Sequence, residues 1–491
     1  MNKKLIAISL ILFCCASSTL FAQTKLKLDG NSAKVQASSS RHVTPRHRPV
    51  VEQPDFDAFF LDRGVRMQYY REGNRMDDKV FLAEEPFILQ RATVIGNEKA
   101  APAKKGAPGA MPNRKVNHVW AGSQRFLLDP TDNGDYRVVL RNAGTGQEIY
   151  SRTYNTLFGE YKNTPEGEKK IVRYEEVVQF PMPIEPVIIS LQKRNKEMDF
   201  ETQAEFPFEP DLAKEDILSG GEENYGTTCL QYNGDPHNHI DIVIVAEGYG
   251  KKDLAKMQKD FEEFKKILFV EEPFKSRQSD FNVWGVYRND RPSGITDPRA
   301  NKKVESAVGA SYNTFGSGRY LMTFNLFKLH ELASLVPWDH IIIMANCSTY
   351  GGGAIYNFYA MSAVTEMSAQ ILPHELGHSI GGLADEYVDE DLSYGDIHQP
   401  DVEPLEPNVT NLVDFKSKWQ DLLPNGDIKI YEPCTLDNPM GTCGELGLYE
   451  GAAYHPTGFY RPVMNCMMRY YAPFCPVCLR TMNRMFDLYC K

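Results

Sequence analysis

The segment HELGH at residues 374–378 constrains the fold and the chemistry of this chain more than any other feature. On an α-helix, residues four apart lie about 40° apart around the axis. His374 and His378 therefore project from one face, as two nitrogen ligands of a metal ion require. Glu375 lies beside that face, where its carboxylate could take a proton from an attacking water molecule. The spacing predicts a zinc-binding helix of the kind that supports peptide hydrolysis.

The turn after this helix predicts a third ligand. The pair Gly381-Gly382 is a strong helix stop, because glycine adopts positive φ angles without strain. The chain can then turn back and present a carboxylate, and we favour Asp385 as the third ligand, with Glu386 as the alternative. In zincins of the metzincin type the third ligand comes six residues after the second histidine. Here Asp385 comes one residue later than that, and the extra glycine can absorb the difference.

The segments just before the motif predict how the helix is entered. Pro373 directly precedes His374, so the helix either begins there or is kinked there. The helical pattern of residues 365–372 favours a kink. Residues 359–363 form a short apolar run, which we expect to be the edge strand along which a substrate extends through main-chain hydrogen bonds.

Other residues of the C-terminal part could contribute to the same site. His398 and His455 could approach the metal, although we favour them less than Asp385. Met467 or Met468 could provide an apolar floor beneath the histidines, as the methionine turn does in metzincins. Methionines also fill gaps in any protein core, so this assignment depends on the zinc helix.

Several short segments share a family pattern with the zinc helix. They are LADEY at 383–387, YEGA at 449–452, YRP at 460–462, CMM at 466–468 and CPVC at 475–478. Together with HELGH they resemble the IgA peptidase family of zinc metallopeptidases, over residues 215–491. Upstream, DIVIVAEGY at 241–249 resembles the opening strand and turn of that family, with Glu247 where aspartate is expected. The segment GGG at 351–353 fits the family as well.

The resemblance implies one catalytic Zn²⁺ ion held by His374 and His378, with Glu375 as the general base. We expect Asp385 to complete the ligand set and water to take the fourth position. Glu375 would accept the proton of that water as it attacks the scissile carbonyl and would then deliver it to the leaving amine. The partner implied is a protein or peptide substrate. Host proteins such as immunoglobulin A are candidates, because some family members cleave it.

The N-terminus predicts export. Lys3-Lys4, the apolar run at residues 5–15 and a cleavage site after Ala22 form a secretory signal peptide at residues 1–22. No later stretch has the ~18 apolar residues of a membrane-spanning helix. We therefore expect the mature chain in the periplasm, at the cell surface or outside the cell.

The expected export bears on the state of the cysteines. Of the ten cysteines, Cys14 and Cys15 fall within the signal peptide, and six crowd into the C-terminal part. In an exported chain such cysteines are expected to form disulfides, with structural zinc as the alternative. Cys347 either stays free or pairs with Cys229. The six C-terminal residues are Cys434, Cys443, Cys466, Cys475, Cys478 and Cys490.

Length and pattern together predict an α+β protein with more than one domain. Residues 23–54 are polar and basic, typical of a flexible leader. Residues 55–205 contain short alternating runs separated by turn signals, which predict an N-terminal β-sandwich domain. Residues 215–491 alternate strands with helices. They predict a zincin-like, metzincin-type mixed α/β catalytic domain, with strands at 240–246, 281–287 and 339–345 and helices at 254–269 and 321–335.

Charge excludes some functions without choosing a substrate. The formal net charge is −11, and no basic face suggests nucleic-acid binding. A different class of function is an adhesin or glycan-binding protein in which the metal is structural. Glu375 argues against it, because a structural metal site does not require a general base. The sequence does not indicate an oligomeric state.

Overall fold

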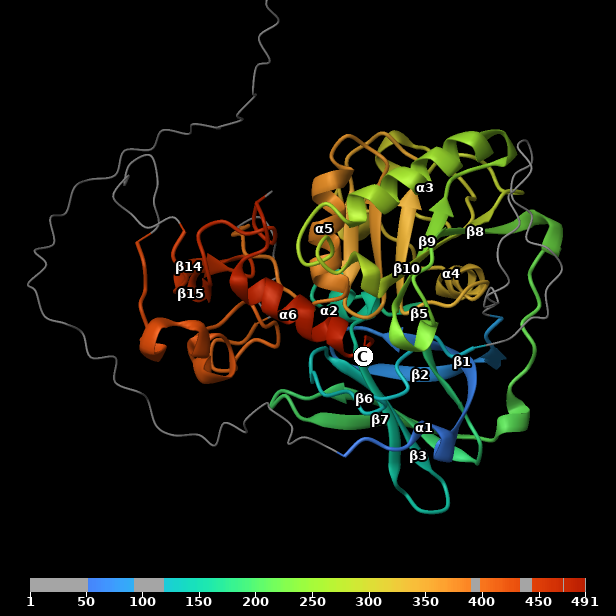
Figure 1. The fold of residues 1–491 in the computed structure, drawn as a ribbon, viewed down its shortest axis with the longest axis horizontal. Coiled ribbons are helices and arrows are strands. Elements are labelled where there is room, and N and C mark those ends of the chain that lie inside the picture. The colour runs from blue at the N-terminus through green and yellow to red at the C-terminus, as the bar shows by residue number, and fades with distance from the viewer. Residues whose placement is uncertain (1–51, 92–118, 390–397, 433–443, 471, 491) are drawn as a thin grey trace, which may run out of the picture. The chain divides into compact units, whose positions relative to one another are not determined.

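The computed structural model describes residues 52–91, 119–389, 398–432, 444–470 and 472–490. The expected signal peptide, nearly all of the expected leader, and Cys434 and Cys443 lie outside these ranges. The described residues form a mixed α+β fold with many strands and few helices (Figure 1). Every helix among them is too short or too polar to cross a bilayer.

The N-terminal part contains two antiparallel sheets around one core. One sheet has the order β2-β1-β5, and the other has the order β4-β3-β6-β7. Buried side chains from both sheets, such as Met67, Leu140 and Phe180, belong to a single apolar cluster. The strands are β1 (Phe60–Gly73), β2 (Asp78–Leu89), β3 (Tyr136–Asn142), β4 (Glu148–Tyr154), β5 (Val172–Pro183), β6 (Val187–Arg194) and β7 (Phe200–Phe208). Helix α1 (Phe56–Phe59) precedes them, and α2 (Leu157–Lys162) connects β4 to β5.

A six-stranded sheet in the order β12-β13-β11-β9-β10-β8 forms the centre of the C-terminal part. The four inner strands run parallel, and the two outer strands, β12 and β8, run antiparallel to their neighbours. The strands are β8 (Tyr225–Gln231), β9 (Ile240–Glu247), β10 (Phe281–Arg288), β11 (His340–Ala345), β12 (Gly352–Ile355) and β13 (Tyr359–Ala363). A small hairpin of β14 (Tyr449–Ala452) and β15 (His455–Arg461) follows.

Helices cover both faces of this sheet, because successive side chains of a strand point to opposite faces. On β9, Ile242 and Ile244 share a core with helices α3 (Leu254–Leu268), α5 (Ser368–Ser379) and α6 (Pro476–Asp487). Val243 and Val245 share the opposite core with α4 (Leu326–Ala333). Figure 1 shows α3 and α5 beside the sheet. This two-sided burial explains why the inner strands are continuous apolar runs.

The predicted elements of this part are present, with two differences. Helix α4 begins at Leu326, five residues after its predicted start, because residues 321–325 are held in an extended segment that bonds to Ser311, Val308 and Tyr359. The strand at residues 359–363 is β13, but it is not the edge of the sheet. The edge on this side of the sheet is β12, whose glycine-rich sequence gives little strand signal.

The predicted disulfides are not formed by the cysteines that the structure describes. All the cysteines that the structure describes are free thiols, namely Cys229, Cys347, Cys466, Cys475, Cys478 and Cys490. Cys347 accepts a hydrogen bond from the Tyr312 hydroxyl at 3.0 Å instead of pairing with Cys229. The sequence favours disulfides because the chain is expected to be exported, with structural zinc as the alternative. In the structure, three of these thiols converge on a buried carboxylate.

Asp241 on β9 and Asp339, which directly precedes β11, make stability depend on pH. Asp241 on β9 is fully buried; its Oδ1 accepts from Trp284 Nε1 at 2.7 Å, and its N–H donates to Asp339 Oδ2 at 2.8 Å. Burial raises the pKa of both carboxyls, and Asp241 further raises that of Asp339. The native state therefore keeps protons that the unfolded chain releases. The free energy that this pair contributes to folding is complete below the ordinary carboxyl pKa. It is lost as pH rises through the raised pKa values of the native state.

Replacing Asp241 by asparagine tests this dependence. Asparagine can still accept from Trp284 but carries no charge, so D241N is expected to raise the unfolding midpoint by at least ~2 °C at about pH 8 and by clearly less at about pH 5, where only part of this stability has been lost. Thermal unfolding followed by circular dichroism at both values measures the effect. The exposed Asp211 supplies the matched control D211N. A midpoint of D241N that follows the wild-type pH profile would refute the buried charge.

Candidate metal centre and active-site cleft

Helix α5 presents the motif residues because its other face is buried. Leu372 and Leu376 belong to the core between the helix and the sheet, which fixes the rotation of the helix. His374 and His378 then lie on the opposite side, with ring centroids 4.8 Å apart and Nε2 atoms 3.1 Å apart. The helix begins at Ser368 and continues through Pro373, so it does not start at the proline.

Each histidine is held by a hydrogen bond from its other ring nitrogen. His374 Nδ1 lies 2.9 Å from the carbonyl oxygen of Met467, and His378 Nδ1 lies 2.6 Å from that of Leu383. Because a carbonyl oxygen can only accept, each Nδ1 donates. In the neutral rings this leaves the lone pair on Nε2, as metal-ligating histidines require.

The chain after α5 returns a carboxylate to these nitrogens. Gly382 has φ +59°, the left-handed conformation that the glycine pair predicts. Asp385 Oδ1 then lies 3.1 Å from His374 Nε2 and 3.4 Å from His378 Nε2, and this oxygen makes no hydrogen bond of normal geometry. Two ligands of one tetrahedral zinc ion are ~3.3–3.4 Å apart when each bond is ~2.0–2.1 Å. The three donor atoms therefore fit a zinc ion.

Charge at this site also suits a cation. Burial alone would lower the pKa of His378, but Asp385 outweighs it and raises the pKa to about 9. Burial would raise the pKa of Asp385, but the histidines hold it well below its usual range. Burial raises the pKa of Glu375, and His374 and His378 offset this only in part. Asp385 thus stays ionised in a buried site, where it favours positive charge beside it.

The other candidate ligands do not join this group of three donor atoms. Glu386 points away from the histidines: its Oε1 accepts from Asn408 Nδ2 at 3.0 Å and lies 3.5 Å from Cys478 Sγ. His398 Nε2 instead lies 3.2 Å from Glu406 Oε2, and the His455 ring stacks on Phe459 with centroids 4.4 Å apart. Among the described residues, the group that joins the two motif histidines contains Asp385 alone of these candidates.

Methionines lie beneath the helix as the sequence suggests. Met467 and Met468 are both buried, and Met467 supplies the carbonyl that holds His374. The sulfur of Met468 lies so close to Gly377 that a Cβ atom there would meet it at 2.5 Å. A side chain at Gly377 would therefore force Met468 to shift.

The three donors and Glu375 line a cleft of about 680 Å³. Strand β12 forms one side: a Cβ atom on Gly352 would lie 3.0 Å from Glu375 Oε1, so the glycine leaves this carboxylate room. The N-terminal part forms another side, through residues such as Asn133, Asn155 and Glu160. Glu160 receives a hydrogen bond from Tyr320 across this boundary. Sequence reasoning missed these residues, because no local motif marks a contact between distant segments.

Tyr454 is a further residue that the sequence did not reveal. Its hydroxyl donates to Asp385 Oδ2, which fixes the carboxylate so that Oδ1 faces the histidines. Partners of this kind typically change metal affinity ~10–100-fold when removed. Tyr454→Phe is therefore expected to weaken zinc binding by that factor, measured by competition with a chromogenic chelator. Tyr460→Phe, on the same hairpin, is the control. Equal zinc affinity of Tyr454→Phe and wild type would exclude this role.

Comparison with known families agrees with the geometry. A family model described as IgA Peptidase M64 matches residues 228–437 and 432–486, a span that contains α5, β12 and Tyr454 of the cleft. A second model, described as Peptidase M64 N-terminus, matches residues 110–205. No curated protein matches the chain. The matched regions cover the six-stranded sheet and the motif helix, and the chain is therefore a member of the IgA peptidase M64 family and a peptidase.

Proposed function

We propose that the protein is an exported zinc-dependent endopeptidase, with His374, His378 and Asp385 as the zinc ligands and Glu375 as the general base. The observation that supports it best is the convergence of His374 Nε2, His378 Nε2 and Asp385 Oδ1 at 3.1–3.4 Å in the cleft that Glu375 also lines. The family model supports hydrolysis of peptide bonds in a protein substrate. Export rests on the signal peptide expected at residues 1–22.

The residues divide the chemistry among them. When bound, zinc would acidify a water molecule and polarise the scissile carbonyl. Glu375 accepts the proton of the attacking water on its carboxylate and then delivers that proton to the leaving nitrogen. Asp385, held by Tyr454, keeps the ligand set anionic enough to retain the cation. The Nδ1 hydrogen bonds of the histidines keep both Nε2 atoms directed at one point.

Strand β12 supplies the place for an extended substrate. It is one of the two outer strands of the sheet, and the cleft is lined by Gly352, Gly353, Ala354 and Ile355. An added peptide strand here would bring its main chain past Glu375. The small side chains of this edge leave room for that approach. Host proteins such as immunoglobulin A remain candidate substrates.

The test uses the chain from residue 23 to residue 491. Bound zinc is measured by elemental analysis, and a library of peptides with blocked termini is assayed before and after chelation. The proposal predicts bound zinc, internal cleavage, loss of cleavage with the chelator and recovery when zinc is restored. Cleavage that persists after the metal is removed would refute zinc dependence. Cleavage that requires a free peptide terminus would indicate an exopeptidase.

A further inference from the structure

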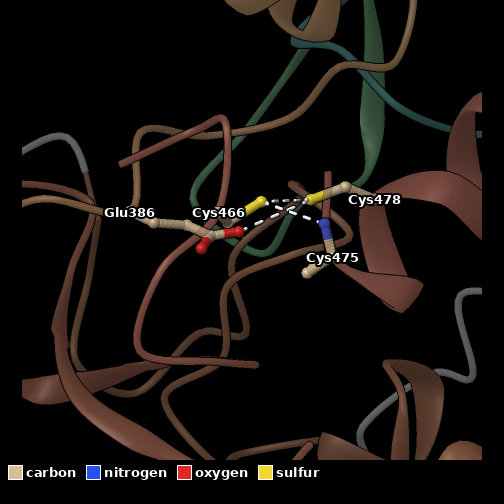
Figure 2. A group of neighbouring side chains, drawn as sticks. All are labelled: Glu386, Cys466, Cys475 and Cys478. Atoms are coloured by element: carbon tan, nitrogen blue, oxygen red, sulfur yellow. Dashed lines mark hydrogen bonds between the residues drawn. The ribbon is translucent and has the colours of Figure 1, made fainter. Parts of the chain in front are cut away.

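A second cluster of metal-binding side chains lies outside the cleft. Glu386, Cys466, Cys475 and Cys478 are at most 4% exposed, and their donor atoms lie within 4.8 Å of one another. Figure 2 shows the Glu386 carboxylate beside the sulfurs of Cys466 and Cys478, with the backbone nitrogen of Cys475 next to them. Cys475 caps the N-terminus of α6 and Cys478 lies in its first turn, whereas the other two come from loops. None of the four lines the cleft.

The distances fit ligands of one ion rather than a covalent bridge. Cys466 Sγ and Cys478 Sγ are 3.7 Å apart, well beyond the ~2.05 Å of a disulfide. Cys478 Sγ lies 3.5 Å from Glu386 Oε1. A tetrahedral zinc ion with Zn–S bonds of ~2.3 Å and a Zn–O bond of ~2.0–2.1 Å places two sulfurs ~3.8 Å apart and a sulfur and an oxygen ~3.6 Å apart. Both observed distances agree.

The cluster also leaves polar atoms without partners. Glu386 is completely buried, and its Oε2 forms no hydrogen bond. A buried polar group without a partner costs free energy that a bound cation would recover. The three thiols could form at most one disulfide among themselves, which would leave one sulfur and the carboxylate unsatisfied. One ion satisfies all four side chains.

The N-terminus of α6 and a backbone N–H group lie beside these sulfurs. Cys475 and Cys478 form a C-x-x-C pair at the start of a helix, where the positive end of the helix dipole stabilises negative charge. The backbone N–H of Cys475 also donates to Cys466 Sγ at 3.3 Å. Such N–H···S bonds stabilise charge on a sulfur.

We propose that Glu386, Cys466, Cys475 and Cys478 bind a second zinc ion, which has a structural role. Three soft sulfur donors and one carboxylate oxygen select zinc over magnesium or calcium. The four protein ligands fill the coordination shell, and burial excludes water, which are the features of a structural site. The proposal is independent of the catalytic zinc, because no ligand is shared.

This second ion would hold the catalytic residues in place. Glu386 directly follows Asp385, and its N–H donates to the Met468 carbonyl at 2.7 Å. Cys466 directly precedes Met467, whose carbonyl holds His374. The ion therefore joins the segment that carries the third ligand to the segment that orients the first histidine. Loss of the second ion is expected to lower peptidase activity through the catalytic site.

The experiment counts zinc and identifies its ligands in the mature chain. Elemental analysis is expected to find two zinc ions in the wild type, one in Cys478→Ser and one in His378→Ala. Cobalt exchanged into His378→Ala should give the near-ultraviolet absorption of a thiolate-to-cobalt transition, and Cys478→Ser should lack it. Cys490→Ser, which removes a buried thiol outside the cluster, should keep both ions.

Further outcomes decide against the inference or separate it from the peptidase proposal. A thiol titration of the unfolded, chelated wild type that finds a disulfide among these three cysteines would overturn it, as would zinc in Cys478→Ser equal to wild type. If Cys478→Ser does not fold, X-ray absorption of wild-type protein decides instead: sulfur neighbours at ~2.3 Å support the site, and their absence refutes it. A thiolate-bound ion without chelator-sensitive cleavage would refute the catalytic proposal and leave this one standing.

Discussion

Glu375→Gln is expected to abolish peptide cleavage while zinc remains bound. The carboxylate lines the cleft beside the three proposed ligands but belongs to none of the metal-binding groups, so glutamine removes the base and leaves the donor atoms intact. Removing a general acid–base typically costs ~10²–10⁴-fold in rate. Because one residue is proposed to serve both proton transfers, we expect the loss at the upper end of that range. Initial rates on the best library peptide, with zinc content measured on the same sample, test it.

The matched control for this variant is Glu366→Gln, which changes an exposed carboxylate two residues before α5. It should cleave at the wild-type rate. A Glu375→Gln enzyme with bound zinc and more than about a tenth of wild-type activity would remove Glu375 from the mechanism.

Asp385→Asn is expected to lose the catalytic zinc. Its Oδ1 lies within 3.4 Å of both histidine Nε2 atoms, and asparagine provides neither the charge nor the same ligand strength. Since changes to groups that only support a ligand cost ~10–100-fold in metal affinity, loss of the ligand should exceed ~100-fold. Zinc competition with chelators of graded affinity measures this, and excess zinc should restore part of the activity.

Glu386→Gln is the comparison that separates the two neighbouring acids. It should leave the affinity of the histidine site above that of Asp385→Asn and should instead remove the thiolate-bound ion. If Glu386→Gln abolished binding at the histidine site and Asp385→Asn retained it, the order of ligands deduced from the structure would be wrong.

The helix and its turn were predictable because their signals are local. The spacing of His374 and His378, and the glycine pair that ends the helix, depend only on backbone geometry over a few residues. The choice between Asp385 and Glu386 as the third ligand was not predictable from local signals. It depends on which carboxylate Tyr454 and the cysteine cluster hold, and these partners lie about 70 to 90 residues further along the chain.

The sheet edge and the cysteines were misjudged for different reasons. β12 has two glycines in its four residues, so propensity gave no reason to place it outside β13. For the cysteines, the expected compartment favours disulfides and leaves structural zinc only as the alternative, because the sequence does not show the carboxylate among them. Only the fold shows that Glu386 is buried against three thiols. The wall that Glu160 adds to the cleft likewise depends on packing between distant segments.

The central claim is that His374, His378 and Asp385 hold one zinc ion beside Glu375. Crystals of the mature chain, measured on both sides of the zinc absorption edge, test it most directly. The account predicts an anomalous peak between His374 Nε2, His378 Nε2 and Asp385 Oδ1, on the side that faces the cleft. A structure of zinc-saturated, active protein with no peak at these three atoms would contradict it.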